Sequence, residues 1–291
     1  MKNIKNITIL KVSLICIVIS YIANALYFMN LTILEPVFLK HYYESNIQRR
    51  YVVILHLITN SDDNREIVDI EFPQLPEDFA YVSLNHVWRN NNGYDRIEKF
   101  AHYDYRTIVL EFHNSDQENT QGDEQSVILD EAKIRYMNGD VQNVDIGKIV
   151  LHKNIKSYDF FDLASASSSN DYTSKLYVQS LKNIAINNIQ SDLDNEIEGF
   201  LETTVNDIKT KDIQYPISFE AGDYISFNSK FLYDSNDIRK YNIYGIKRRI
   251  HITDSEGNKG YGLIYNLDYE PTNVFSTEKS IIDYLKYRGV K

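Results

Sequence analysis

Cysteine is nearly absent from this sequence of 291 residues. The single cysteine, Cys16, lies inside an apolar run near the N-terminus, so the chain that follows the run contains no thiol. Disulfide bonds, thiol nucleophiles and cysteine-ligated metal sites are therefore excluded there. The bulky Ile15 before Cys16 also argues against lipidation at that position.

Glycine is scarce as well, and the motifs that depend on it are missing. None of the 11 glycines forms G-x-G-x-x-G or the Walker pattern that binds phosphate, and no G-x-S-x-G nucleophile motif occurs. The one S-x-x-K, from Ser276 to Lys279, falls where a helix is expected to begin, so we interpret it as a cap with its first turn. We predict no catalytic residues and a protein that is not an enzyme.

The histidines lack the spacing that puts two imidazoles on one metal, because neither H-E-x-x-H nor H-x-H occurs. Two of them, His56 and His251, lie in strand-like runs, where a hydrogen-bonded structural role is expected. The run His102 to Arg106 alternates polar and tyrosine side chains, which indicates cross-strand packing rather than a binding strip. We predict no metal site and no cofactor. The seven histidines are His41, His56, His86, His102, His113, His152 and His251.

Two acidic loops, 116–124 and 254–258, carry oxygen ligands of the kind that calcium prefers. Neither matches the EF-hand pattern with its distal glutamate. We interpret both as solvated turns, with a loop-borne calcium site as the alternative.

Basic residues are outnumbered over most of the chain. Residues 35–291 hold all 41 acidic residues but 28 of the 31 basic ones, a formal net charge of −13. Nucleic-acid binding needs a basic face, and the one short basic run is Lys247-Arg248-Arg249. We expect no nucleic-acid partner, and we interpret that run as a solvated strand edge.

A long apolar run is what the N-terminus does contain. Residues 12–34 include no charge, and Lys2, Lys5 and Lys11 precede them. As a helix, 23 residues span roughly 35 Å, enough to cross the hydrocarbon core of a bilayer. The positive-inside rule keeps the basic end in the cytoplasm. We predict a single-pass anchor over 1–34, with the bulk of the chain outside the cytoplasm.

A cleavable signal peptide is the alternative, because Ala23-Asn24-Ala25 has the small-x-small pattern that precedes cleavage. Signal peptidase would then cleave after Ala25, and the protein would be secreted. The apolar run continues past the usual h-region of roughly 7 to 15 residues, which favours the uncleaved anchor. The heavy use of Ile, Asn and Lys is typical of an AT-rich bacterial genome, and we expect a Gram-positive cell envelope.

The remaining chain has an extended pattern. The run 51–59 is rich in β-branched and aromatic residues and ends in a polar turn cluster at 60–64. We predict further strands at 66–72, 81–88, 107–112, 176–181, 198–205, 224–232 and 241–252.

Two hairpins and one helix stand out locally. Asn138-Gly139 joins two strand-like runs and favours a type I′ turn, and the acidic loop 254–258 joins another two. The helix is expected over 277–288, with Gly289 as its stop and the second domain as its packing partner.

These strands predict an all-β protein of two tandem immunoglobulin-like antiparallel β-sandwich domains. We place the first domain at 35–155, a serine-rich linker or loop at 156–172, and the second domain with the C-terminal helix at 173–291. The segment Asp69 to Pro73 recurs as Asp212 to Pro216, which indicates an internal duplication or two unrelated β domains.

An anchor, two β modules and no catalytic motif predict a non-enzymatic protein-protein interaction or accessory subunit of a cell-envelope assembly. The tyrosine-rich surface fits recognition, since a tyrosine ring buries area while its hydroxyl forms hydrogen bonds. The alternative is a carbohydrate- or cell-wall-binding module in which exposed tyrosines and Trp88 stack on sugar rings. A hydrolase with acidic residues from distant loops is a third hypothesis. The protein partner and any small-molecule ligand stay unidentified.

Overall fold

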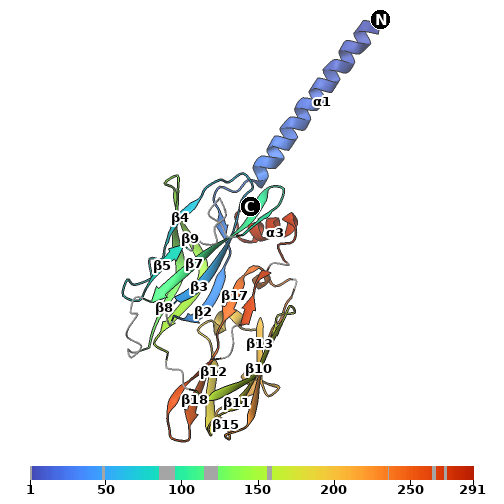
Figure 1. Cartoon of the computed structure of the whole chain (residues 1–291). Helices are drawn as coiled ribbons and strands as arrows, with labels where there is room; N and C mark the ends of the chain where they lie inside the picture. Colours follow the sequence, from blue (N-terminus) through green and yellow to red (C-terminus); the bar gives the residue numbers. More distant parts are fainter. Residues whose placement is uncertain are drawn as a thin grey trace.

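A computed structural model describes residues 2–47, 50–84, 96–114, 124–155, 159–234, 236–263, 267–271 and 274–291, with the side chains of 2–9, 96 and 263 excepted. The N-terminal helix α1 (Lys2–Leu31) projects from one end of the molecule (Figure 1). Its segment Leu10–Leu31 has 22 residues, none of them buried, and is long and apolar enough to cross a membrane.

Two sheets form the sandwich nearest to α1. The first contains β1 (Val37–Phe38), β3 (Arg50–Asn60), β7 (Tyr103–Asn114) and β5 (Ala80–Leu84) in that order, with β6 (Arg96–Lys99) also on β7. The second has the order β20 (Leu267–Tyr269), β17 (Ile243–Ile246), β2 (His41–Asn46), β9 (Val141–Lys153), β8 (Gln125–Tyr136) and β4 (Ile67–Glu71).

The core of this sandwich lies between its two sheets. Leu55 and Leu110 from the first sheet meet Ile134 and Ile149 from the second in one fully buried cluster. Alternate residues of each strand face inward, as the period of two along a strand requires. The second sheet is mixed rather than purely antiparallel, because β2 pairs in parallel with both β9 and β17.

The second sandwich lies at the end away from α1 (Figure 1). One sheet has the order β10 (Phe161–Ser169), β11 (Thr173–Ser180), β16 (Tyr224–Phe231), β13 (Leu201–Val205) and β14 (Ile208–Lys209). The other has β15 (Ile217–Phe219), β12 (Ile184–Gln190), β18 (Arg249–Asp254) and β19 (Lys259–Leu263). Buried Leu176, Phe227, Ile186 and Ile252 join the two sheets in one core. The predicted fold of two tandem β-sandwiches behind an N-terminal apolar helix is confirmed.

The remaining short elements lie between strands. They are helix α2 (Asp194–Ile197) and the 3-10 turns η2 (Thr210–Asp212) and η3 (Ile238–Tyr241). An aromatic cluster beside α2 joins the two sandwiches: Phe200 and Phe231 from one side contact Tyr244 and Tyr269 of the other, with ring centroids 5.2 to 5.7 Å apart. This buried contact fixes how the sandwiches meet.

Both predicted hairpins are present. The strands β8 and β9 pair with Arg135 opposite Val141, and β18 and β19 pair with Arg249 opposite Leu263. The first turn is not type I′, because Gly139 has a φ of +92° but Asn138 is not left-handed. A longer loop lets one glycine supply the only positive φ that the turn needs.

The serine-rich segment is a strand, so its prediction as a linker or loop at 156–172 was wrong. Residues 161–169 form β10, the edge strand next to β11, with a bulge between Leu163 and Ser165. Almost every side chain of β10 is exposed. A strand that is solvated on both faces needs no apolar alternation, which is why the sequence pattern missed it.

The predicted single strand at 241–252 is two strands in different sandwiches. The first part, β17, joins the sheet of β2, whereas β18 joins the sheet of β12. The chain returns to the first sandwich once more in β20. Residues 173–291 are therefore not one continuous domain, and we propose that the first domain takes in 238–246 and 267–291 in addition to 35–155.

The C-terminal helix α3 (Glu278–Tyr287) is one residue shorter at each end than the predicted 277–288 and packs elsewhere. Thr277 caps it by accepting a hydrogen bond from the N–H of Ser280 (3.4 Å), and Gly289 with a φ of +68° ends it. Its buried face lies on the first sandwich, against Ile33, Tyr103 and Tyr105. The prediction that it packs on the second sandwich was wrong, because β20 carries the chain back before the helix begins.

The expected repeat of Asp69 to Pro73 at Asp212 to Pro216 is not matched in structure. Residues 69–71 belong to strand β4, whereas residues 213–216 lie outside any strand, between η2 and β15. The two segments are similar in sequence but differ in secondary structure.

Candidate functional site at the junction of the sandwiches

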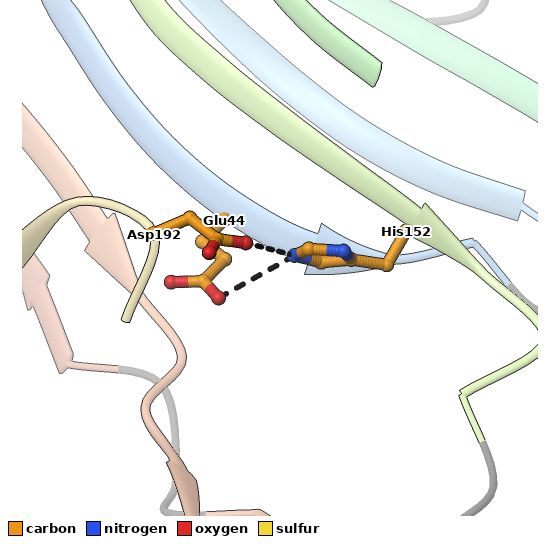
Figure 2. Close-up of side chains that lie close together, drawn as sticks. All are labelled: Glu44, His152 and Asp192. Atoms are coloured by element: carbon orange, nitrogen blue, oxygen red, sulfur yellow. Dashed lines mark ion pairs between the residues drawn. The ribbon is translucent and has the colours of Figure 1, made fainter. Parts of the chain in front are cut away.

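Three side chains from separate elements meet where the sandwiches join (Figure 2). Glu44 lies on β2, His152 near the end of β9, and Asp192 in the turn between β12 and α2. His152 Nε2 is 3.4 Å from Glu44 Oε1 and 3.1 Å from Asp192 Oδ2. Parallel pairing of β2 with β9 sets Asn46 opposite His152, so that Glu44 lies two residues away on the same face.

Arg249 binds the same carboxylates from the first residue of β18. Its Nη2 lies 2.8 Å from Asp192 Oδ2 and its Nη1 lies 3.0 Å from Glu124 Oε1, while its Nε is 3.5 Å from Glu44 Oε1. The hydroxyl of Ser191 donates a hydrogen bond to Glu44 Oε2. We call Glu44, His152, Asp192 and Arg249 the junction cluster.

The junction cluster is largely withdrawn from water. Glu44 is 1% exposed, His152 2% and Arg249 7%, whereas the side chain of Asp192 keeps 39% of its exposure. Charges this deep are costly unless they are paired. Glu44 Oε1, Arg249 Nε and both ring nitrogens of His152 nevertheless make no hydrogen bond.

A pocket of about 280 Å³ opens beside the junction cluster. Glu44, His152 and Arg249 line it together with Arg50 and Lys247. The ammonium of Lys247 donates to Ser45 Oγ at 2.8 Å, and burial lowers the pKa of Lys247 below its usual value. The pocket gives a small solute or ion access to the buried groups.

The basic run Lys247-Arg248-Arg249 is therefore not a solvated edge, and that interpretation was wrong. Arg248 pairs with Asp194 at 2.9 Å, and Arg249 is buried in the junction cluster. Acidic residues from distant segments converge on this run, which the linear sequence does not reveal.

The predicted sites fall in other places. His56 and His251 lie in strands as expected, with His56 Nδ1 2.7 Å from the hydroxyl of Tyr105. In the second acidic loop, Asp254 Oδ1 accepts hydrogen bonds from the N–H groups of Glu256 and Asn258, so its carboxylate holds its own turn. His86, Trp88 and residues 116–123 of the first acidic loop lie outside the described residues.

His152 was the residue that sequence reasoning missed. His152 directly follows the apolar residues 149–151, and no candidate partner for its imidazole lies nearby in the sequence. The sequence shows only that Glu44 and His152 are polar residues in runs that otherwise resemble strands. This observation points to a site only when the pairing of β2 with β9 is known.

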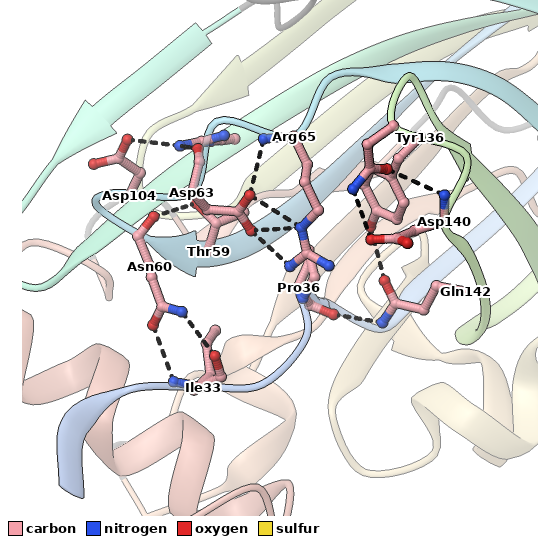
Figure 3. A network of polar contacts seen from close by, with 12 residues as sticks. Ile33, Pro36, Thr59, Asn60, Asp63, Arg65, Asp104, Tyr136, Asp140 and Gln142 are labelled. Atoms are coloured by element: carbon pink, nitrogen blue, oxygen red, sulfur yellow. Dashed lines mark hydrogen bonds and ion pairs between the residues drawn. The ribbon is translucent and has the colours of Figure 1, made fainter. Parts of the chain in front are cut away.

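A second polar network fastens the chain where it leaves α1 (Figure 3). Asn60 pairs with the backbone of Ile33, and Gln142 Nε2 donates to the carbonyl of Pro36 at 2.9 Å. The guanidinium of Arg65 binds Asp63 through Nε and Nη2, at 2.8 Å in the closest contact. Each of these polar groups forms hydrogen bonds within the network, so we assign the network a structural role in holding this part of the chain.

The last turn of α1 also contacts the first sandwich. The rings of Tyr27 and Phe28 lie against His102, with centroids 6.0 and 5.7 Å apart. Tyr103 donates to the carbonyl of Leu31, and the ammonium of Lys291 donates to the carbonyl of Asn30 at 2.7 Å. The first and last elements of the chain thus meet at the base of α1.

Comparison with known proteins adds no identity. No protein-family model and no curated protein sequence matches this chain. Among solved structures, the chain is similar to the D00-D0 domain of intimin, with 11% identity, 81% of this chain and 100% of that chain covered, and a TM-score of 0.25. A protein from Porphyromonas gingivalis gives 10% identity, 81% and 99% coverage, and a TM-score of 0.25. Tandem immunoglobulin domains of titin give 8% identity, 81% and 96% coverage, and a TM-score of 0.21.

TM-scores and identities at this level carry no argument about activity or partners. The two β-sandwiches are defined by the sheets of this chain.

Proposed function

We propose that this protein is a single-pass, membrane-anchored interaction module of a bacterial, Gram-positive cell envelope. The basic end of α1 lies in the cytoplasm and both sandwiches lie outside. The module has no enzymatic activity of its own and acts as an accessory subunit by binding an extended segment of a partner protein.

The observation that carries this proposal is the edge strand β10. Within the described strands it has one neighbour, β11, so its other edge presents backbone donors and acceptors. Natural edge strands are usually blocked by lysine, proline or a covering loop. From Leu163 to Ser169 β10 has only small or apolar uncharged side chains and no proline, and all of them are exposed.

Such an edge fits binding by strand addition. An extended peptide pairs its backbone with the free edge, and the small side chains of Ser165, Ala166 and Ser167 let it approach closely. The bulge near Leu163 limits the regular edge to the part that follows it.

The arrangement of the molecule suits this role. The base of α1 is fastened to the first sandwich, and the aromatic cluster fastens the second sandwich to the first. The sandwich that carries β10 lies at the end away from α1 (Figure 1). An anchored module of this shape presents its free edge at a distance from the membrane.

A carbohydrate- or wall-binding surface is the second candidate. Tyr177 and Tyr224 are 46% and 62% exposed. They lie on neighbouring strands, where Tyr177 pairs with Ser226 and Tyr224 pairs with Gln179, so both rings share one face of the sheet. Aromatic rings on an open sheet face are suited to stacking on sugars.

The test compares three full-length proteins isolated from native membranes in mild detergent. They are the wild type, a variant with Ser165→Lys and Ser167→Lys, and the matched control Ile208→Lys on β14, the opposite edge of the same sheet. We expect the wild type and the control to retain a stoichiometric protein partner. The β10 variant should lose that partner.

Equal recovery with all three proteins would contradict binding through β10. Retention of all three on purified wall polymer, with loss only in a Tyr177→Ala and Tyr224→Ala variant, would move the wall-binding function to first place.

A further inference from the structure

The junction cluster contains a set of metal-type ligands, and the sequence-based expectation of no metal site does not account for it. We propose that Glu44, His152 and Asp192 bind one divalent transition-metal ion of the zinc type, which joins the two sandwiches. This site is independent of the proposed binding role of β10.

The first step is geometric. The three candidate ligand atoms lie within 4.8 Å of one another. Zinc bonds of ~2.1 Å to nitrogen and oxygen place neighbouring ligands ~3.4 Å apart in a tetrahedron. The distances from His152 Nε2 to Glu44 Oε1 and Asp192 Oδ2 are 3.4 and 3.1 Å, close to that separation.

The second step concerns hydrogen bonding. His152 is 2% exposed, its Nε2 points at both carboxylates, and it makes no hydrogen bond there (Figure 2). Glu44 Oε1 is buried and also lacks a hydrogen bond. Buried polar atoms are normally satisfied. A metal ion between them would bond to both of these atoms.

The third step concerns charge. The carboxylates of Glu44, Asp192 and Glu124 surround one guanidinium, that of Arg249. The three carboxylates and the guanidinium sum to two excess negative charges, which one divalent ion would balance. Of the cations that also line the pocket, Arg50 pairs with Glu111 and Lys247 lies near Asp268 as well as Glu44. Arg249 would keep Glu124 as a partner outside the ligand set, and its hydrogen bond to Asp192 would hold that ligand in position.

The donor types select the metal. An imidazole nitrogen with two carboxylate oxygens suits zinc and its neighbours better than calcium, which takes six to eight oxygens. Glu44 and His152 also line the pocket beside the junction cluster, from which water would complete the coordination.

A metal here would act on both sandwiches. Glu44 and His152 belong to the mixed sheet of the first sandwich, and Asp192 follows β12 of the second. The ion would link the two sandwiches through its ligands, in addition to the packing of the aromatic cluster between them.

The test titrates Zn²⁺ into the full-length protein in mild detergent, purified with a histidine-free tag and stripped with chelator. Calorimetry is expected to show one Zn²⁺ per chain, and the thermal midpoint of unfolding is expected to rise with Zn²⁺. His152→Gln should weaken binding at least tenfold, and Asp192→Asn should weaken it as well. The control His251→Gln, on β18 near Arg249, should bind like the wild type.

Circular dichroism verifies that each variant is folded before titration. Absence of a one-to-one binding event in the wild type would overturn the proposal. Binding that His152→Gln and Asp192→Asn leave unchanged would also overturn it, since the ion would then lie elsewhere.

Discussion

The side-chain amide of Asn60 forms hydrogen bonds with both the N–H and the carbonyl of Ile33. Its Nδ2 donates to the carbonyl of Ile33 at 2.7 Å, and its Oδ1 accepts from the N–H of Ile33 at 2.9 Å (Figure 3). Ile33 is the second residue after α1, and Asn60 ends the long strand β3. One side chain therefore fixes the residues that follow α1 to the frame of the first sandwich.

Replacing Asn60 by Ala is expected to cost about 1–3 kcal/mol, because it removes two hydrogen bonds to part-buried backbone groups. The residues after α1 should also become more sensitive to protease. Urea unfolding and limited proteolysis of the full-length protein measure both effects. As a control, Asn138→Ala removes an exposed turn side chain and should leave the sensitivity of residues 32–36 unchanged. Equal cleavage of wild type and Asn60→Ala would contradict the fastening role.

Gly147 is the position where an added methyl group should do the most harm. Its φ is +101°, and a Cβ there would lie 2.4 Å from the carbonyl oxygen and 2.6 Å from the nitrogen of His41. The parallel pairing of β2 with β9 brings these backbones together.

Gly147→Ala should therefore destabilise by about 1–3 kcal/mol more than Gly139→Ala, the difference being the cost of overpacking. Gly139 has a similar φ of +92° but nothing within 4 Å of an added Cβ, so it isolates the backbone strain. Urea unfolding of both variants measures the difference, and equal losses would show that the β2–β9 approach is looser than described.

Arg249→Met is expected to destabilise by about 3–5 kcal/mol, because it leaves the buried Glu44 carboxylate without its guanidinium partner. The matched control is Arg135→Met, whose ion pair with Asp69 is about half exposed and should contribute no more than about 1 kcal/mol. Both unfolding free energies should be measured in chelator, so that metal does not compensate. Similar losses in the two variants would mean that the junction cluster does not stabilise the fold.

The acid stability of the protein should depend on His41. Burial lowers the pKa of His41 from 6.5 to about 3. The ring is held neutral, since its Nε2 accepts the N–H of His56 at 2.9 Å. Above pH 6.5 neither state carries a proton there, whereas between pH 6.5 and 3 only the unfolded state does. Stability from this group is therefore complete above pH 6.5 and decreases as the pH falls towards 3, by about 1.4 kcal/mol per pH unit.

His41→Gln supplies an oxygen that can accept the same N–H and has no titrating ring. Its unfolding free energy should decrease between pH 7 and pH 4.5 by about 2–3 kcal/mol less than that of the wild type. Urea unfolding at the two pH values tests this. Parallel pH profiles would show that His41 titrates normally in the folded state.

Features set by neighbouring residues could be predicted from the sequence. The hairpin around Gly139 and the C-terminal helix depend on a few adjacent side chains and on the φ angles that glycine permits, although the cap is Thr277 and not the predicted Ser276. The strand β3 was predicted because its β-branched and aromatic run is continuous. The strand β10 was not, because serine and alanine have no intrinsic strand pattern and β10 forms through hydrogen bonds to β11.

The candidate site could not be predicted, because its members come from segments far apart in the chain. Glu44 and Asp192 are 148 positions apart, and Arg249 is another 57 beyond. Each alone resembles an ordinary charged residue. Their common position follows from β2 pairing with β9 and from β18 lying beside the turn after β12.

The sequence by itself determined an apolar N-terminal helix, a chain without thiols beyond it, and an all-β body with hairpins within 132–144 and 249–265. These depend on composition and on contacts between near neighbours. Only the tertiary structure decided that β17, β20 and α3 return to the first sandwich, that β10 is an edge strand among the described strands, and that Glu44, His152, Asp192 and Arg249 meet. Those outcomes depend on burying apolar faces and pairing charges between distant segments, and a local pattern contains no record of which distant segment will supply the partner.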